Sequence, residues 1–145
     1  MKISKIREVK DPVRANETDA GIDFFVPKEF DTVDLEPQQS VFIPSGIKVN
    51  VPKGYALVAF NKSGVALKKN LDVGASVVDC GYQGEIHIHL TNVGNSPVNI
   101  APEEKIIQFV LLKLGEPSIE FVPEDELYSY SSNRGTGGFG STGIK

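Results

Sequence analysis

The chain has 145 residues, of which 40% are hydrophobic and 23% charged, a composition typical of one globular domain. Its net charge of −4 provides no global basic field, so we expect no direct nucleic-acid binding. The longest apolar stretch is far shorter than the ~20 residues of a membrane helix, and a single cysteine, Cys80, excludes an internal disulfide framework. These features predict a cytoplasmic protein with no membrane partner.

Short segments that alternate apolar and polar residues follow one another along the chain, separated by Gly and Pro turns. Residues 47–51 and 86–91 alternate in this way, and residues 105–114 form a denser apolar run of strand type. Only residues 63–69 have a helical pattern. The sequence therefore predicts an all-β fold, an antiparallel sandwich or barrel with one short helix.

Two polar sites precede the middle of the chain. Asp23 follows a tight turn and by itself is a loop carboxylate. Asn61, Lys62, Ser63 and Gly64 stand at the start of the helical segment, where a hydroxyl, backbone N–H groups and a lysine suit an anion. An ordinary helix cap by Asn61 or Ser63 explains the same residues more simply.

The segment around Asp79 is the candidate catalytic region. Asp79 directly follows an apolar pair, and glycines nearby predict a hairpin turn. A carboxylate at the point where a buried strand leaves its sheet can orient and deprotonate water, and Tyr82 can pack on a sugar, although aspartate is also common in turns. We expect Cys80 to be a small packing residue. His87 and His89 share a strand face but lack a third ligand for zinc.

The composition changes after residue 127, where the chain becomes polar and rich in glycine. Such a stretch buries too little apolar area to offset the entropy lost when it becomes ordered. We therefore expect residues 128–145 to form a mobile arm that follows a domain of residues 1–127. Within it, Arg134 suits a phosphate, Phe139 suits a base, and Ser141 and Thr142 add donors among the glycines. A nucleoside triphosphate fits this set, whereas a passive tail is the alternative.

Taken together, these segments resemble the deoxyuridine triphosphatase (dUTPase) family, and the resemblance runs through nearly the whole chain. It implies a distorted β-jelly-roll homotrimer with active sites between subunits, each closed by a C-terminal arm. The segments that carry it are Ala20-Gly21-Ile22-Asp23, Lys62-Ser63-Gly64, the block from Gly74 to Gly84, Lys105-Ile106-Ile107-Gln108, and Arg134 to Gly143.

The resemblance also implies the reaction. The enzyme would hydrolyse dUTP to dUMP and pyrophosphate, which keeps uracil out of DNA and supplies dUMP for thymidylate synthesis. Asp79 would be the general base that directs water onto the α-phosphorus, and Tyr82 would leave no room for a 2′-hydroxyl. Mg2+ would sit on the triphosphate oxygens, with Asp23 reaching it only through water.

The other implied contacts are with the base and the phosphates. Main-chain groups of residues 76–78, and of the facing chain near His87, would read the uracil edge, and a narrow hairpin would exclude a 5-methyl group. Arg134 would bind the γ-phosphate and Phe139 would cap the uracil. The full set of expected substrate contacts is Lys62, Ser63, Gly64, Ser76, Val77, Val78, Tyr82, His87, Gln108, Arg134, Phe139, Gly140, Ser141 and Thr142.

The chain departs from the family pattern at several positions. Lys62 and Lys105 stand where arginine is usual, which removes the bidentate fork, and Ser76 replaces a common glycine.

Three alternatives remain: a dCTP deaminase on the same fold, a non-catalytic nucleotide-binding regulator, and a jelly-roll structural protein. Deaminases carry an Ala-Arg pair after their serine motif, whereas Gly64 and Val65 follow here. The retained Asp79 argues against a binding protein without activity.

Overall fold

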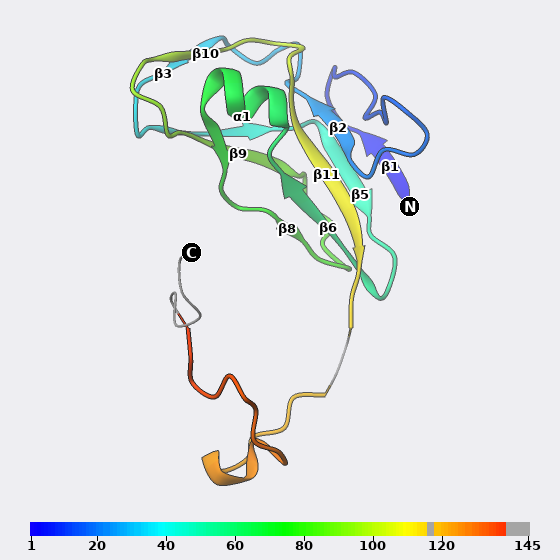
Figure 1. Cartoon of the computed structure of the whole chain (residues 1–145). Helices are drawn as coiled ribbons and strands as arrows, with labels where there is room; N and C mark the ends of the chain where they lie inside the picture. The colour runs from blue at the N-terminus through cyan, green and yellow to red at the C-terminus, as the bar shows by residue number, and fades with distance from the viewer. Residues whose placement is uncertain (116–117, 139–145) are drawn as a thin grey trace. The chain divides into compact units, whose positions relative to one another are not determined.

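A computed structural model describes residues 1–115 and 118–138 of the chain. The chain divides into two compact units, Met1–Gly115 and Glu116–Lys145 (Figure 1). The composition placed this boundary after residue 127, because residues 118–127 still contain large apolar side chains. In the structure those side chains are not part of a core, since Ile119 is 84% and Phe121 95% exposed.

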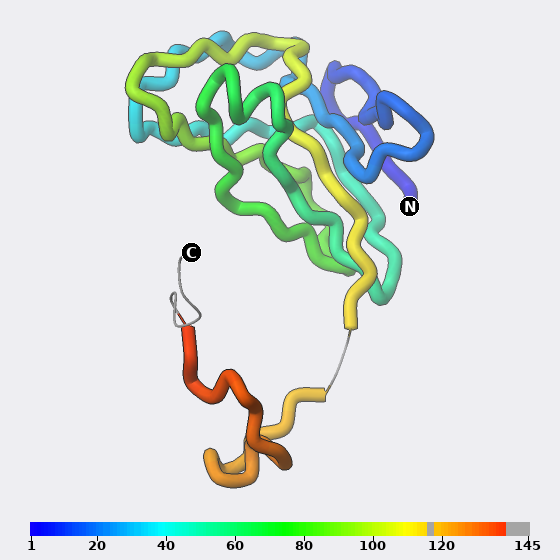
Figure 2. The backbone as a smooth tube through the Cα atoms, in the orientation of Figure 1, coloured from blue at the N-terminus to red at the C-terminus, as the bar shows by residue number. Residues whose placement is uncertain are grey.

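The first unit is an antiparallel β structure with one helix (Figure 1), and Figure 2 traces the path of its backbone. Its strands are β1 (Lys2–Lys5), β2 (Ile22–Phe25), β3 (Val33–Leu35), β4 (Ser40–Pro44), β5 (Ile47–Asn50), β6 (Tyr55–Phe60), β7 (Leu71–Val73), β8 (Val77–Val78), β9 (His87–Asn92), β10 (Val98–Ile100) and β11 (Lys105–Lys113).

The strands form four small sheets whose neighbours are mostly distant in sequence. The larger two have the orders β2-β11-β6-β8 and β4-β9-β7, and β1-β5 and β10-β3 form pairs. Such crossovers between sheets are typical of a jelly roll. The all-β prediction is therefore confirmed, including the strands expected at residues 47–51, 86–91 and 105–114.

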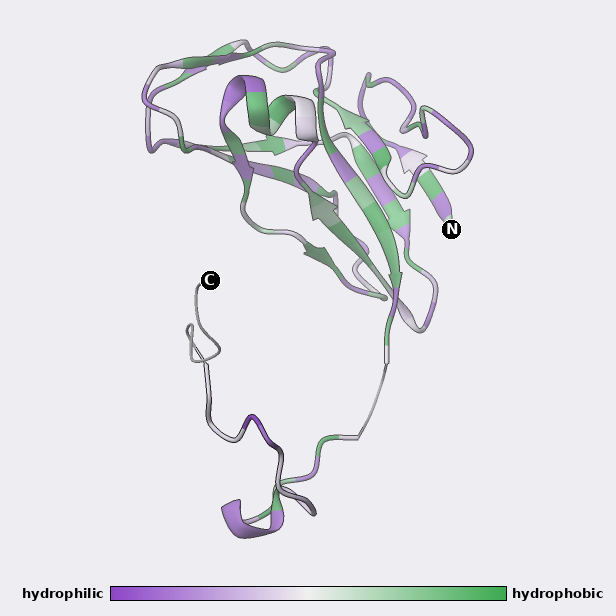
Figure 3. Cartoon of the chain, viewed as in Figure 1, coloured by the Kyte–Doolittle hydropathy of each residue, from purple (hydrophilic) through white to green (hydrophobic). Residues whose placement is uncertain are grey.

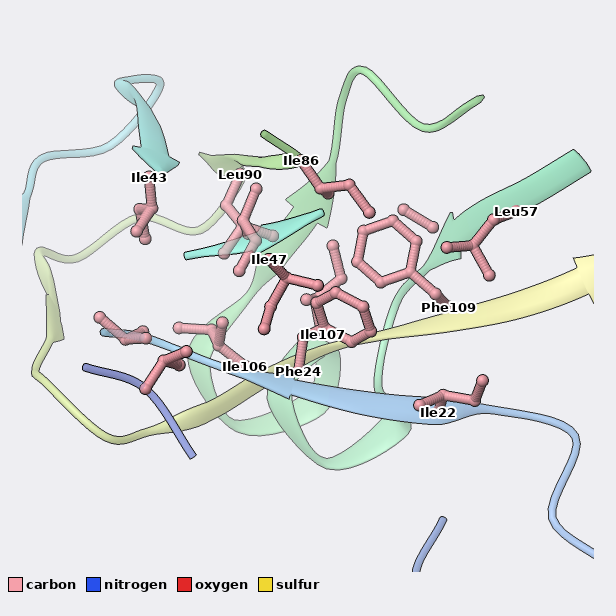
Figure 4. Packing of buried hydrophobic residues seen from close by; sticks show 14 of the residues in the cluster. Ile22, Phe24, Ile43, Ile47, Leu57, Ile86, Leu90, Ile106, Ile107 and Phe109 are labelled. Carbon is pink, nitrogen blue, oxygen red and sulfur yellow. The ribbon is translucent and has the colours of Figure 1, made fainter. Parts of the chain in front are cut away.

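The core contains residues of all four sheets. Alternate residues of β9 point inward, so that Ile88 and Leu90 are completely or almost completely buried. They belong to one buried cluster with residues of β2 and β11, where the rings of Phe24 and Phe109 lie 4.5 Å apart (Figure 4). Full burial of each such side chain contributes about 1.5–3 kcal/mol, and this rigid core supports the loops described below.

Helix α1 (Ser63–Lys69) has the bounds that the sequence predicts. It ends at Asn70, whose left-handed backbone (φ 50°) lets its N–H donate to Ala66 O. The expected cap is wrong, because Lys62 is the N-cap residue and no side chain caps the helix. The Asn61 side chain instead bonds outside the helix, donating to Asp72 and accepting from the Val73 N–H.

The described part of the second unit contains a short 3-10 helix, η1 (Glu124–Glu126). Hydrophilic residues prevail from η1 onwards (Figure 3). Among the described residues of the whole chain, no helix has the length and apolar character that crossing a membrane requires.

Candidate active site

A cavity of about 180 Å³ opens beside the end of β8. It brings together many of the residues that the sequence singled out. Asp79 and Tyr82 come from the loop after β8, and His87 begins β9. The complete lining is Phe42, Ala75, Val77, Val78, Asp79, Tyr82, Ile86, His87 and Phe109.

The cavity exists because the expected hairpin is open. The prediction placed a buried strand directly before Asp79, but β8 has two residues and Val77 is 61% exposed. β8 pairs with β6, whereas β9 pairs with β4 and β7, so the two arms belong to different sheets. The arms meet at Gly74, whose N–H donates to His89 O at 3.0 Å. A Cβ at Gly74 would lie 2.1 Å from His89 Nδ1, which explains the glycine.

The turn after β8 presents Asp79 to solvent. The Tyr82 N–H donates to Asp79 O at 3.2 Å, and Gly81 adopts φ +93°, a left-handed conformation that favours glycine. Asp79 is exposed and takes part in none of the ion pairs found among the described residues. Its carboxylate is thus accessible to a water or a substrate. Cys80 is exposed as well, so its expected packing role is wrong.

Tyr82 and His87 are held by the same acceptor. The Tyr82 hydroxyl donates to Glu85 O at 2.9 Å, and His87 Nδ1 lies 3.0 Å from that oxygen. A carbonyl oxygen only accepts, so Nδ1 of His87 carries the proton. The Glu85 carboxylate is bound by Arg7 through both oxygens, and this contact lowers the pKa of Glu85 against the opposing effect of burial.

Phe42 is a lining residue that the sequence analysis missed. It lies on β4, it is 59% exposed, and its ring stacks on His87 with centroids 4.6 Å apart and planes 9° apart. The signal was present in the alternation of β4, where Ile43 points into the core and a large ring therefore faces outward. An exposed aromatic residue on a strand indicates a binding surface when it lies beside a cavity.

The second cluster of expected residues surrounds a buried carboxylate. Asp23 lies within β2 with its side chain 8% exposed, so it is not the loop carboxylate that the sequence suggested. Lys62 donates to its Oδ1, and Lys105 Nζ lies 3.1 Å from its Oδ2. Gln108 pairs with Asp23 across β2 and β11 and donates to Asn61 O at 2.8 Å. Three distant segments thus converge on one basic, hydrogen-bonded cluster.

The start of α1 adds donors beside this cluster. Ser63 and Gly64 are exposed and directly follow Lys62. Apart from its chain neighbours and the backbone of its own helix, no described atom lies within 4 Å of the position that a Cβ would take at Gly64, so this side of the backbone is open to a ligand. Two ammonium groups, a hydroxyl and backbone N–H groups suit the oxygens of a polyphosphate.

These residues do not by themselves make a metal cage. The described residues contain no group of three or more His, Cys, Asp or Glu side chains placed to hold a metal ion. Each carboxylate oxygen of Asp23 is already paired with an ammonium group. The donor set therefore fits a divalent ion that comes with a polyphosphate and receives most of its ligands from it.

The arm residues fall partly within the described chain. Arg134 is exposed, and its Nε donates to Gly137 O at 2.9 Å within the second unit. The expected contacts of Phe139, Gly140, Ser141 and Thr142 lie outside the described residues.

Comparisons with known proteins agree with this geometry. The dUTPase family model matches residues 7–143. The deoxyuridine 5′-triphosphate nucleotidohydrolase of Leifsonia xyli subsp. xyli is 37% identical over 135 residues, covering 91% of this chain and 84% of that protein. The solved structure of Staphylococcus bacteriophage 80alpha dUTPase with dUPNHPP has a TM-score of 0.87 at 27% identity, covering 99% and 98% of the two chains. A mutant dUTPase of phage phi11 of S. aureus, solved for its structural Mg(II) ion, has a TM-score of 0.77 at 26% identity, covering 86% and 97%. The chain therefore belongs to the dUTPase family.

Proposed function

We propose that the chain hydrolyses dUTP to dUMP and pyrophosphate, with Asp79 as the base that activates the attacking water. The observation that carries this proposal is the solvent-accessible Asp79 carboxylate on the wall of a cavity shared with Tyr82 and His87. A nucleoside in that cavity brings its α-phosphate towards the loop after β8. The family assignment supplies the substrate.

The cavity walls account for selection of the nucleoside. Main-chain groups of Ser76, Val77 and Val78 read the uracil edge from one arm of the open hairpin, and the chain at His87 faces them from the other. The Tyr82 ring lies against the deoxyribose and excludes a 2′-hydroxyl, which discriminates against UTP. The two arms lie against the edge of the base and leave no room for the 5-methyl group of dTTP.

The chemistry is one displacement at phosphorus. Asp79 takes a proton from water, the water oxygen bonds to the α-phosphorus, and the bond from the α-phosphorus to the oxygen that bridges to the β-phosphorus breaks. Pyrophosphate leaves with the electrons of that bond. The protein contributes chiefly orientation and charge neutralisation, as is common in phosphoryl transfer.

The phosphate contacts come from the basic cluster and the arm. Lys62, Ser63, Gly64 and Gln108 bind phosphate oxygens, and Arg134 binds the γ-phosphate. In the last residues of the arm, Phe139 caps the uracil, and Gly140, Ser141 and Thr142 complete the phosphate contacts. The arm orders on the substrate and excludes water from the site.

Mg2+ accompanies the triphosphate. When bound, the ion neutralises phosphate charge and fixes the conformation of the chain of phosphates. When the ion is bound, Asp23 would be the protein residue that contacts it, and only through water. The ammonium groups of Lys62 and Lys105 hold Asp23 in place for that contact.

Assembly into a homotrimer explains how one site receives all these groups. Among the described residues, the cavity lining contains no lysine or arginine, although its ligand carries a highly charged triphosphate. The basic cluster involves β2 and β11, which lie on the other side of β6 from β8 in the sheet. A neighbouring subunit that contributes its basic cluster supplies the missing positive charge. We place the enzyme in the cytoplasm, where its one cysteine stays reduced.

Pyrophosphate release from dUTP, UTP, dTTP and dCTP, with and without Mg2+, tests the proposal. We expect release from dUTP alone, and we expect it to depend on Mg2+ and to fall by several powers of ten in Asp79→Asn while dUTP still binds. Ammonia release from dCTP would indicate a deaminase instead. Binding of dUTP without any hydrolysis would indicate a regulator.

A further inference from the structure

Glu85 joins the N-terminal segment of the chain to the nucleoside cavity. Its side chain is 13% exposed, and both carboxylate oxygens are occupied. Oε1 accepts from Arg7 Nε at 2.8 Å and from the Gly46 N–H at 2.7 Å, and Oε2 accepts from the second Arg7 nitrogen at 3.1 Å. A two-point arginine–carboxylate contact of this kind fixes orientation as well as distance.

The same residue holds two walls of the cavity through its main chain. The Glu85 carbonyl oxygen accepts from the Tyr82 hydroxyl and from His87 Nδ1. Tyr82 lies on the sugar side of the proposed site and His87 on the base side. One carbonyl group is therefore bonded to both rings, in addition to the stacking of Phe42 on His87.

The chain around Gly46 is shaped to receive Arg7. Gly46 adopts φ +74°, and a Cβ there would lie 2.9 Å from the Cβ of Arg7. The Ile6 N–H donates to Gly46 O at 2.8 Å, and the Ser45 N–H donates to Ile86 O at 3.0 Å. The N-terminal segment, the turn between β4 and β5, and the loop before β9 thus form one connected unit.

We propose that the Arg7–Glu85 ion pair is a positioning device for substrate selection, which sets the Tyr82 and His87 rings through the Glu85 carbonyl. This inference rests on the proposed role of Tyr82 in excluding a 2′-hydroxyl. Without Arg7, the largely buried Glu85 carboxylate keeps only the Gly46 N–H among its described donors and must turn towards water. That movement rotates the carbonyl away from the two rings.

The test compares Arg7→Met with Lys28→Met. Lys28 forms an ion pair with Glu8 at 2.6 Å in which both side chains are more than half exposed, and neither residue lines the nucleoside cavity. We expect Arg7→Met to lower the preference for dUTP, measured as kcat/KM for dUTP divided by kcat/KM for UTP, by about tenfold. The change should come chiefly from a higher KM for dUTP, since a small misplacement of a binding group weakens the binding of the correct substrate. Lys28→Met should leave the ratio unchanged. Arg7→Lys, which keeps the charge but loses the fork, should restore part of the preference.

Hydrogen–deuterium exchange without nucleotide tests the device independently of the reaction. The Tyr82 and Ile86 amides donate to Asp79 O and Ile47 O, so both should exchange faster in Arg7→Met and not in Lys28→Met. Unchanged exchange overturns the proposal whatever the kinetics show. Arg7→Lys takes the place of Arg7→Met if the latter does not fold.

A Tyr82→Ala variant distinguishes a failure of the positioning device from a failure of the proposed function. If this variant keeps the normal preference for dUTP, the sugar role of Tyr82 is wrong, and the positioning device is judged by exchange alone. If Tyr82→Ala loses the preference but Arg7→Met keeps it, the positioning device is wrong and the proposed function stands.

Discussion

Removal of the Phe42 ring is expected to weaken substrate binding without unfolding the protein. The ring stacks on His87 at 4.6 Å and lines the nucleoside cavity. An aromatic pair of this kind is worth about 1 kcal/mol beyond its buried area. In Phe42→Ala, the His87 ring loses that support, and substrate binding must order the ring instead. A cost of about 1 kcal/mol in binding free energy raises KM for dUTP about fivefold.

The assay is steady-state pyrophosphate release, with kcat and KM determined separately. We expect kcat to change by less than about twofold, because the ring touches no phosphate in the proposed site. Stability should change little, since Phe42 is 59% exposed. Phe42→Tyr keeps the stack and serves as the control with normal KM. A wild-type KM in Phe42→Ala would refute the reasoning from the stack.

The remaining predictions concern the basic cluster, acid stability and the arm. Asp23→Asn should raise KM for dUTP about tenfold at saturating Mg2+, because both lysines lose a charged hydrogen-bond partner, and an unchanged KM counts against the cluster. The pKa of Glu85 is lowered below its ordinary 4.5, so its contribution to stability is present above that value and lost as pH falls through the folded pKa. Urea unfolding at decreasing pH should therefore show a smaller acid loss in Arg7→Met than in wild type, and equal losses contradict the ion pair's role. Deletion after Asn133 should leave the first unit folded, by circular dichroism, but almost inactive; normal turnover would exclude the arm as a lid.

Local sequence patterns predicted the parts of the molecule that depend on near neighbours. The alternation in β9 and β5 identified which residues face the core, and the single helical segment was correct at both ends. Asp79 and Tyr82 of the cavity wall were singled out, but the local pattern fits an ordinary turn equally well, and their roles came from the resemblance to the dUTPase family. These signals need only the period of a strand and the chemistry of a turn.

Contacts between distant segments could not be predicted in the same way. Arg7 and Glu85 are 78 positions apart, and nothing in either local sequence specifies the other. The burial of Asp23 between two lysines depends on the order of β2, β11 and β6 in the sheet. The open hairpin was missed because β8 pairs with β6, a choice that the apolar pair Val77-Val78 does not reveal.

The position of bond cleavage tests the central claim most directly. Hydrolysis of dUTP in water enriched in heavy oxygen, followed by mass spectrometry of both products, shows which phosphorus the water attacks. With Asp79 directing water onto the α-phosphorus, the label appears in the phosphate of dUMP and pyrophosphate remains unlabelled. Label in pyrophosphate, with none in dUMP, would contradict the account.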